Sequence, residues 1–358
     1  TAAAGGAAVV GVQGCDVTGP VDEDAMAAAL DAVRGADVAV VALGLDHTLE
    51  EEGTDRTYIH LPDAQEQLLD AVLSLSPPPP AVVVVLFNGG TVSVENATAA
   101  ARGGRNVAVL EAFLPGFRGA EAVAAVLFGD RSPSGKLPAT VYARELVDRV
   151  GLNVMALGEG GGRTHRFLPP RGGDVLYPFG YGLTYSSVEL GWRGWGPKRP
   201  AGGSRAWEGA VVACDGGKRG EEREGRGPRP PARRLPTSAP LASVVVEVRN
   251  EGSRGAAEVV QAYVQPLDVR QRRPPKVQVV RQLASFAKIE IPAGTSKCVE
   301  LPLAVGAFAL SDEGGDVVVA PGRYGVVVTT DGAAGTSELV EARVDLVGRE
   351  VVVQEFPL

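Results

Sequence analysis

The sequence is poor in cysteine, histidine and aromatic residues, and it has no long apolar run. Its three cysteines, Cys15, Cys214 and Cys298, lie far apart and form no C-x-x-C pair, which excludes a zinc-finger site and a disulfide framework. The longest apolar run, AVVVVLF at 81–87, is strand length, far below the roughly 20 residues that a membrane-spanning helix needs. We therefore expect no metal and no membrane partner.

The balance of charge is acidic, and it excludes a further class of partner. There are 35 Lys and Arg residues against 43 Asp and Glu, which gives a net charge of -8 and an isoelectric point of about 5.2. Such a chain is not expected to bind nucleic acid or an anionic membrane as its main partner. Hydrophobic residues make up 45% of the 358 residues, enough for a buried core and, by length, for two domains.

The first 185 residues alternate strand-like and helix-like segments. Apolar runs at 7–12, 37–44, 81–87 and 106–113 predict strands, and periodic segments at 21–35, 61–75 and 119–129 predict helices. Continuous Val, Ala and Leu strands separated by helices are typical of a parallel sheet that is covered on both faces. The pattern predicts a mostly parallel α/β/α sandwich over residues 1–190.

The rest of the chain has a different composition. Residues 191–240 are rich in Gly, Pro and Arg, which favours a disordered insert or linker. From residue 241 onward, short β-branched runs such as ASVVVEVRN and EVVQAYVQP are separated by turn residues, with no helical periodicity between them. This pattern predicts an all-β, immunoglobulin-like sandwich over residues 241–348.

Carboxylates crowd the loop that follows the strand predicted at 37–44. Five carboxylates fall within ten residues: Asp46, Glu50, Glu51, Glu52 and Asp55. Arg56 comes directly after them. Ligands bind beyond the carboxyl ends of the strands in a doubly wound sheet, where this loop is expected. Neighbouring carboxylates raise one another's pKa, and an acid that keeps its proton near neutral pH can donate it in catalysis. By spacing alone, both a solvated acidic turn and a catalytic acid remain open.

Several blocks extend this signal along the chain. The loop reads G-L-D, then E-x-E-G-x-D-R, then L-P-x-x-Q, and further blocks follow at 110–142, 162–167 and 176–187. In this order they resemble glycoside hydrolase family 3, especially its plant-type β-xylosidase branch. The region from 241 is similar to the fibronectin type III-like domain that ends many members.

The resemblance implies a retaining exo-glycosidase with two carboxyl groups about 5 Å apart. In the family, an aspartate forms a glycosyl-enzyme, and a glutamate protonates the leaving oxygen and later activates water. Motif position makes Glu52 this general acid/base, with Glu50 as the alternative because the spacing of the loop varies. Asp55 and Arg56 match the D-R pair and either order the loop or contact the sugar. The implied substrates are xylan or arabinoxylan oligosaccharides, or aryl β-glycosides, with no cofactor.

The nucleophile has no counterpart in this sequence. In the family it lies on an N-terminal (β/α)₈ barrel, which needs about 250 residues, whereas the segment after Thr1 already resembles the approach to the second domain. We expect the chain to depend on such a barrel and to be inactive alone. A non-catalytic carbohydrate-binding or interaction module is the alternative. A nucleotide-binding protein is disfavoured, because no G-x-G-x-x-G or P-loop follows a strand.

Two expectations concern modification and location, and three departures concern specificity. Asn96-Ala97-Thr98 is an N-glycosylation sequon, and with the resemblance it implies an extracellular or cell-wall protein. The departures put fine specificity in doubt more than fold: Phe117 replaces the family's glutamate after Pro-Gly, His165 replaces a tyrosine, and Thr91 follows two glycines where the family has a proline. Phe113 stands where the family often has a sugar-facing aromatic.

Overall fold

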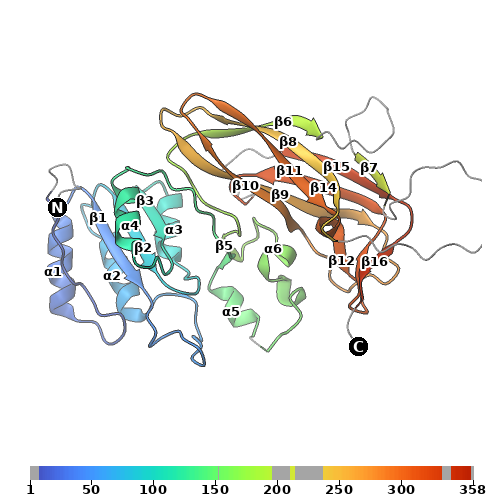
Figure 1. Ribbon diagram of the computed structural model, residues 1–358. Helices are drawn as coiled ribbons and strands as arrows, with labels where there is room; N and C mark the ends of the chain where they lie inside the picture. Colours follow the sequence, from blue (N-terminus) through green and yellow to red (C-terminus); the bar gives the residue numbers. More distant parts are fainter. Residues whose placement is uncertain (1–7, 152, 196–209, 214–236, 333–339, 356–358) are drawn as a thin grey trace, which may run out of the picture. The chain divides into compact units, whose positions relative to one another are not determined.

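A computed structural model describes residues 8–151, 153–195, 210–213, 237–332 and 340–355 (Figure 1). The chain divides into two compact units. The first holds residues up to Arg131 together with Thr140–Gly151 and Gly173–Tyr177, and the second holds the remainder. The predicted fold class is confirmed, since a parallel sheet with helices in the first unit is followed by antiparallel sheets in the second.

The first unit alternates helices and strands along the chain. Its elements are α1 (Glu23–Arg34), β1 (Ala39–Gly44), α2 (Asp63–Leu73), β2 (Val82–Phe87), α3 (Glu95–Arg102), β3 (Val107–Glu111), α4 (Gly119–Leu127), β4 (Val141–Tyr142), α5 (Glu145–Arg149) and β5 (Val175–Tyr177). Strands β1, β2 and β3 lie side by side in that order, all parallel, so their carboxyl ends meet at one edge (Figure 1).

One face of this sheet carries the core of the unit. Alternate residues of β1 and β2 pack with apolar side chains of α1, α2 and α3; the buried members include Val41, Leu43, Val84, Leu69 and Ala97. Local signals fix the helices. The Asp22 carboxylate accepts a hydrogen bond from the Ala25 amide at the start of α1, and acidic residues occupy the first turns of α1 and α2.

The outer edge of β1 is open. Among the described residues, β1 pairs only with β2, and Val38 and Val40 are 52% and 51% exposed. The strand predicted at 7–12 is not formed over residues 8–12, where Val9 and Val10 are exposed. An apolar run of this length gains strand structure only when a neighbouring strand completes its hydrogen bonds, and residues 8–12 pair with no strand among the described residues.

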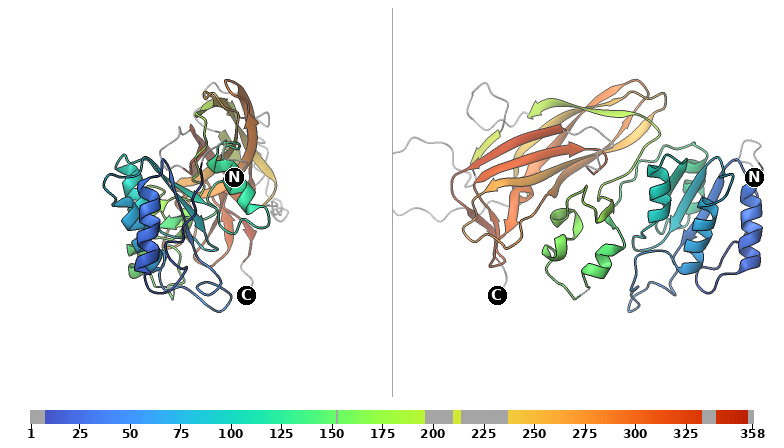
Figure 2. Two further views of the ribbon diagram at one scale, coloured as in Figure 1. Left: turned by 90° about the vertical axis from the view of Figure 1, so that its left-hand side faces the viewer. Right: turned by 180° about the vertical axis from the view of Figure 1, so that it is seen from behind.

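The second unit is a sandwich of strands that pair antiparallel, except for β7, which pairs parallel with β15 (Figure 2, right). One sheet has the order β10-β9-β14-β15-β7 and the other β11-β8-β6, with a small third sheet β12-β13-β16. The strands are β6 (Val188–Trp195), β7 (Ala210–Ala213), β8 (Pro240–Asn250), β9 (Ala256–Val269), β10 (Gln282–Ile291), β11 (Ser296–Ala304), β12 (Ala309–Ser311), β13 (Val317–Val319), β14 (Gly322–Thr329), β15 (Val340–Val347) and β16 (Val351–Gln354). The short helix α6 (Thr164–Phe167) belongs to this unit too.

Alternation along the strands builds the core of the sandwich. On β8, Val244, Val246 and Val248 are fully buried, and they share one cluster with alternate residues of β9 and β14 such as Val260 and Val326. This is the inward–outward pattern of two packed sheets. Strand β6 pairs with β8, so the sandwich begins before residue 190. The predicted insert falls largely on 196–209 and 214–236, outside the described residues.

Two sequence blocks that carried the family resemblance have structural roles in this unit. Lys136, from the G-K-L-P block, forms a buried ion pair of 2.7 Å with Glu258 of β9 and donates a hydrogen bond to the Gly182 carbonyl oxygen. His165 of the 162–167 block stacks on Phe179 with ring centroids 4.1 Å apart. These motif residues therefore hold segments against the sandwich.

No helix in the described part of the chain has the length and apolar character required to span a bilayer.

Candidate functional site

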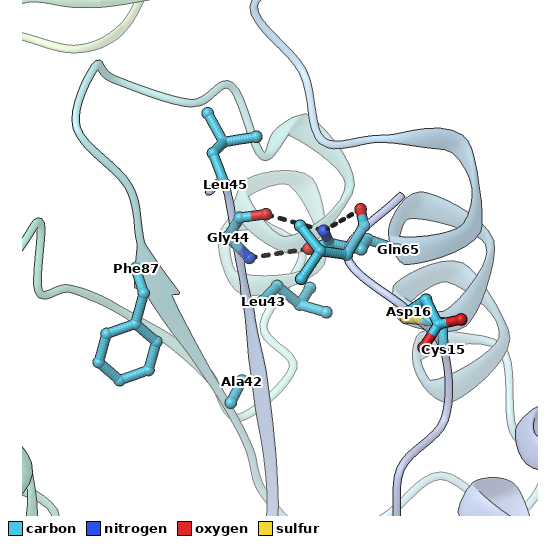
Figure 3. A pocket seen from close by; sticks show the side chains of 9 residues that line it. Cys15, Asp16, Ala42, Leu43, Gly44, Leu45, Gln65 and Phe87 are labelled. Atoms are coloured by element: carbon cyan, nitrogen blue, oxygen red, sulfur yellow. Dashed lines mark hydrogen bonds between the residues drawn. The ribbon is translucent and has the colours of Figure 1, made fainter. Parts of the chain in front are cut away.

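The last residue of β1 is held by the side chain of Gln65. This amide accepts a hydrogen bond from the Gly44 amide at 2.8 Å and donates to the Gly44 carbonyl oxygen at 2.7 Å (Figure 3). It also donates to the Val17 carbonyl oxygen at 2.9 Å. Gln65 thus pairs with the open edge of β1 as a neighbouring peptide group would. It lines a cavity of about 240 Å³ together with residues that include Cys15, Asp16 and Phe87 (Figure 3).

Glycine is required at the end of β1 by close packing against β2. A Cβ atom on Gly44 would collide with the backbone carbonyl group of Phe87. The G-L-D and L-P-x-x-Q motifs are therefore explained together, because Gly44 and Gln65 fix the point at which the acidic loop leaves the sheet.

The first carboxylate of the loop, Asp46, is held ionised. It accepts hydrogen bonds from the hydroxyl group of Thr48 at 2.5 Å and from its amide at 3.0 Å, and these bonds lower the pKa of Asp46 below its usual value. The pKa of Asp46 therefore moves opposite to the expectation that crowding raises it, because the hydrogen bonds from Thr48 outweigh the opposing effect of burial. Asp46 serves the turn and is a poor candidate for an acid.

Glu50 is fully engaged inside the unit. Its carboxylate accepts hydrogen bonds from Arg56 Nε at 2.7 Å and from the backbone amide of Gly90, which follows β2. Arg56 also donates to the Thr91 carbonyl oxygen at 3.3 Å. Gly89 and Gly90 leave room for this pair, since a Cβ on either would lie within 3 Å of a Glu50 oxygen. Glu50 and Arg56 therefore tie the acidic loop to the end of β2.

Glu52 is placed differently, at the tip of a two-residue turn. Glu51 and Thr54 exchange both backbone hydrogen bonds, at 3.0 and 3.2 Å, and Gly53 has a φ of +85°. A positive φ at this position favours glycine, which explains the Glu-Gly pair of the motif. Glu52 is exposed, whereas Glu50 is half-buried. Of the two candidate acids, Glu52 is the one whose carboxyl group is presented outward.

The remaining predicted residues lie in and around this edge. Asp55 is exposed. Beside the predicted set, His60 stacks on Tyr58 with ring centroids 4.7 Å apart. Arg56 is only 10% exposed, and its Nη1 atom has no hydrogen-bond partner among the described residues. Asn96 is exposed on α3 and donates to Asp70 at 2.6 Å.

The third strand contributes a residue that the sequence analysis did not select, next to Phe113, which it did. Glu111 ends β3, and its carboxylate accepts a hydrogen bond from the Phe113 amide at 3.0 Å. Burial raises the pKa of Glu111 against the opposing effect of hydrogen bonds from Phe113 and the Asn88 side chain. Phe113 has a φ of +50°, unusual for a residue with a side chain. The sequence signal that could have identified Glu111 is a charged residue at the end of the apolar run that forms β3.

Within the described residues, no group of three His, Cys, Asp or Glu side chains could hold a metal ion.

Comparison with known proteins identifies the family of this chain. The model of the "Glycosyl hydrolase family 3 C-terminal domain" matches residues 4–185, and that of the "Fibronectin type III-like domain" matches residues 258–331. The chain belongs to glycoside hydrolase family 3. The predicted family is confirmed.

Relatives within family 3 include xylosidases and glucosidases. A protein of Aspergillus fumigatus named "Probable exo-1,4-beta-xylosidase" is 30% identical over 92% of this chain. "Beta-D-xylosidase 1" of Arabidopsis thaliana is 39% identical over 45% of it. The solved structure of a family 3 β-glucosidase from Bifidobacterium adolescentis is 29% identical, with a TM-score of 0.65 over 92% of this chain and 42% of its own. The chain spans 38% of the Aspergillus relative and 20% of the Arabidopsis one.

Proposed function

We propose that this chain supplies the general acid/base of a retaining, exo-acting β-xylosidase-like glycoside hydrolase. The observation that carries the proposal is the contrast at the acidic turn. The Glu50 carboxylate is hydrogen-bonded to Arg56 and to the Gly90 amide. Glu52 is exposed at the tip of the turn, in the loop that follows the carboxyl end of a parallel strand. Family membership and the names of the xylosidase relatives support the reaction class.

In the proposed mechanism, Glu52 donates its proton to the glycosidic oxygen as the bond to the leaving group breaks. An aspartate of an N-terminal barrel attacks the anomeric carbon and forms the glycosyl-enzyme. Glu52, now a carboxylate, then removes a proton from the water that releases the sugar. Arg56 and Glu50 hold the loop through their mutual ion pair and the hydrogen bond from the Gly90 amide. The proposed substrates are xylan or arabinoxylan oligosaccharides, or aryl β-glycosides.

The proposal is tested in a protein that contains both this chain and a barrel. Glu52→Gln should lower kcat steeply on xylobiose, whose leaving group needs protonation, and much less on an aryl xyloside with an acidic phenol. Glu51→Gln is the matched control, since Glu51 is an exposed neighbour in the same turn, and it should behave as wild type. Equal losses on both substrates, or none on either, would sink the assignment. Binding of xylo-oligosaccharides without turnover would favour the non-catalytic module.

An extracellular or cell-wall location and glycosylation at Asn96 are proposed with this function. Thr98 of the sequon is 2% exposed, and its hydroxyl group bonds to the Val94 carbonyl oxygen, so attachment of a glycan would have to precede folding. The mass of secreted material before and after peptide N-glycosidase treatment decides whether Asn96 is used, with Asn96→Gln as control.

A further inference from the structure

The turn that bears Glu52 lies between two attachments to the segment that follows β2. Before the turn, the Glu50 carboxylate accepts a hydrogen bond from the Gly90 amide. After the turn, the Ile59 carbonyl oxygen accepts a hydrogen bond from the Ser93 amide at 2.7 Å. The turn itself is closed by bonds between its own backbone groups, so the attachments on either side of it fix where it lies.

The first of these attachments involves a buried side chain. Asn88 is the first residue after β2, and it is fully buried. Its Nδ2 atom donates a hydrogen bond to the Gly90 carbonyl oxygen at 2.8 Å. A buried donor is costly to leave unpaired, so this bond is strongly favoured in the folded unit. Gly90 is thus held through its carbonyl oxygen by Asn88 and through its amide by Glu50.

Two glycines in this segment are shaped to the ion pair of the acidic loop. A Cβ atom on Gly90 would lie 2.9 Å from one Glu50 oxygen and 3.0 Å from Arg56 Nη2, and a Cβ atom on Gly89 would lie 2.8 Å from the other Glu50 oxygen. Neither of these two glycines has a positive φ, so the backbone conformation alone does not require glycine there. The close approach of the ion pair does require it, and Arg56 extends this contact to the next residue through its bond to the Thr91 carbonyl oxygen.

We propose that Asn88 is a positioning residue for the acidic loop: through Gly90 it fixes the Glu50 carboxylate, and with it the turn that bears Glu52. Each step is a hydrogen bond, from the Asn88 side chain to Gly90 and from the Gly90 amide to Glu50. The catalytic meaning of this role rests on the proposed function. The structural role does not, because it can be measured in the chain itself without turnover.

The structural role is tested by residue-resolved amide hydrogen exchange on the 358-residue chain. Asn88→Ala should raise exchange about tenfold at Gly90, whose amide bonds to Glu50, and at Thr54, whose amide closes the turn. The amide of Val84, in the middle of β2, reports opening of the whole unit and should be unchanged. A rise that includes Val84, or a rise confined to Gly90, overturns the proposal.

Gly90→Ala is a second variant, and it decides the question if Asn88→Ala fails to fold. Its methyl group displaces the Glu50 carboxylate while the Asn88 side chain is kept, so exchange at Thr54 should rise in this variant too. Gly173→Ala is the matched control, because a Cβ atom on Gly173 would meet nothing within 4 Å and this glycine belongs to the same unit. An unchanged Thr54 amide in Gly90→Ala would break the link between Glu50 and the turn, and the proposal with it.

In a protein that also contains a barrel, a positioning role has a signature that loss of stability does not produce. Loss of folded enzyme lowers the rate alike on every substrate. Asn88→Ala should instead lower kcat about tenfold on xylobiose and less than about twofold on an aryl xyloside with an acidic phenol, because only xylobiose needs the positioned proton. Equal losses on both substrates contradict the catalytic role. If Glu52→Gln fails its own test while Thr54 still responds to Asn88→Ala, the proposed function fails and the positioning of the loop is supported.

Discussion

Replacement of Gln65 by methionine should destabilise the first unit strongly. Methionine has nearly the same length and helix propensity as glutamine, so the change removes hydrogen bonds and little else. Three bonds are lost, two to Gly44 and one to Val17. Gln65 is 2% exposed and Gly44 is buried, so the freed backbone groups of Gly44 are left unpaired. Each unsatisfied buried group costs about 1–3 kcal/mol.

We expect the free energy of unfolding of this unit to fall by about 2–4 kcal/mol. This value is at the lower end of the summed costs of the unpaired groups, because water in the adjoining cavity can satisfy part of the freed backbone. The stability of this unit is measured by hydrogen exchange at the amides of β2 as the urea concentration is raised. A probe within the unit is needed because two units need not unfold together. Gln13→Met is the control: Gln13 is exposed and bonds only to the Asp16 side chain among the described residues, so its loss should cost under about 0.5 kcal/mol. A cost below about 0.5 kcal/mol for Gln65→Met would refute the role given to this amide.

Two further predictions concern the second unit. Burial and two nearby guanidinium groups lower the pKa of His165 to about 4. As pH falls, the unfolded chain therefore binds a proton at this residue before the folded chain does. The free energy of unfolding should drop by about 1–2 kcal/mol between pH 6.5 and 4. His165→Phe, which keeps the stack on Phe179, should flatten this part of the pH profile of the urea midpoint; an unchanged slope would contradict the assignment. Lys136→Met leaves Glu258 buried and unpaired and should cost about 3–5 kcal/mol. Arg323→Met, in an exposed pair with Asp345 in the same unit, should cost little by the same measurement.

The sequence predicted most of the elements because their signals are local. The apolar run that became β1 and the capped periodic segment that became α1 needed no distant partner to be recognised. Helix α3 was not predicted, because it has only eight residues and too few turns for a clear periodic pattern. The strand predicted at 7–12 failed for the opposite reason, because strand structure depends on a neighbour that no local pattern reports.

The site was predictable in position but not in detail. The acidic loop was placed correctly at the carboxyl edge from the order of strands alone. Which glutamate is tied down was not predictable, because the Glu50 carboxylate is fixed by the amide of Gly90, forty residues away in the chain. Glu111 was not selected for a related reason. Its burial depends on how the end of β3 packs in the folded unit, which spacing within one loop cannot show.

The open edge of β1 has a practical consequence for anyone who purifies this chain. Within the part of the chain that the structure describes, no strand pairs with the outer edge of β1 before Gly44, and this edge beside two half-exposed valines is a template onto which a strand from another molecule can add. Losses on concentration, or slow growth of large species during storage, are then expected from this edge rather than from the acidic loop. The net charge of -8 opposes such association at long range, so added salt should make the losses worse.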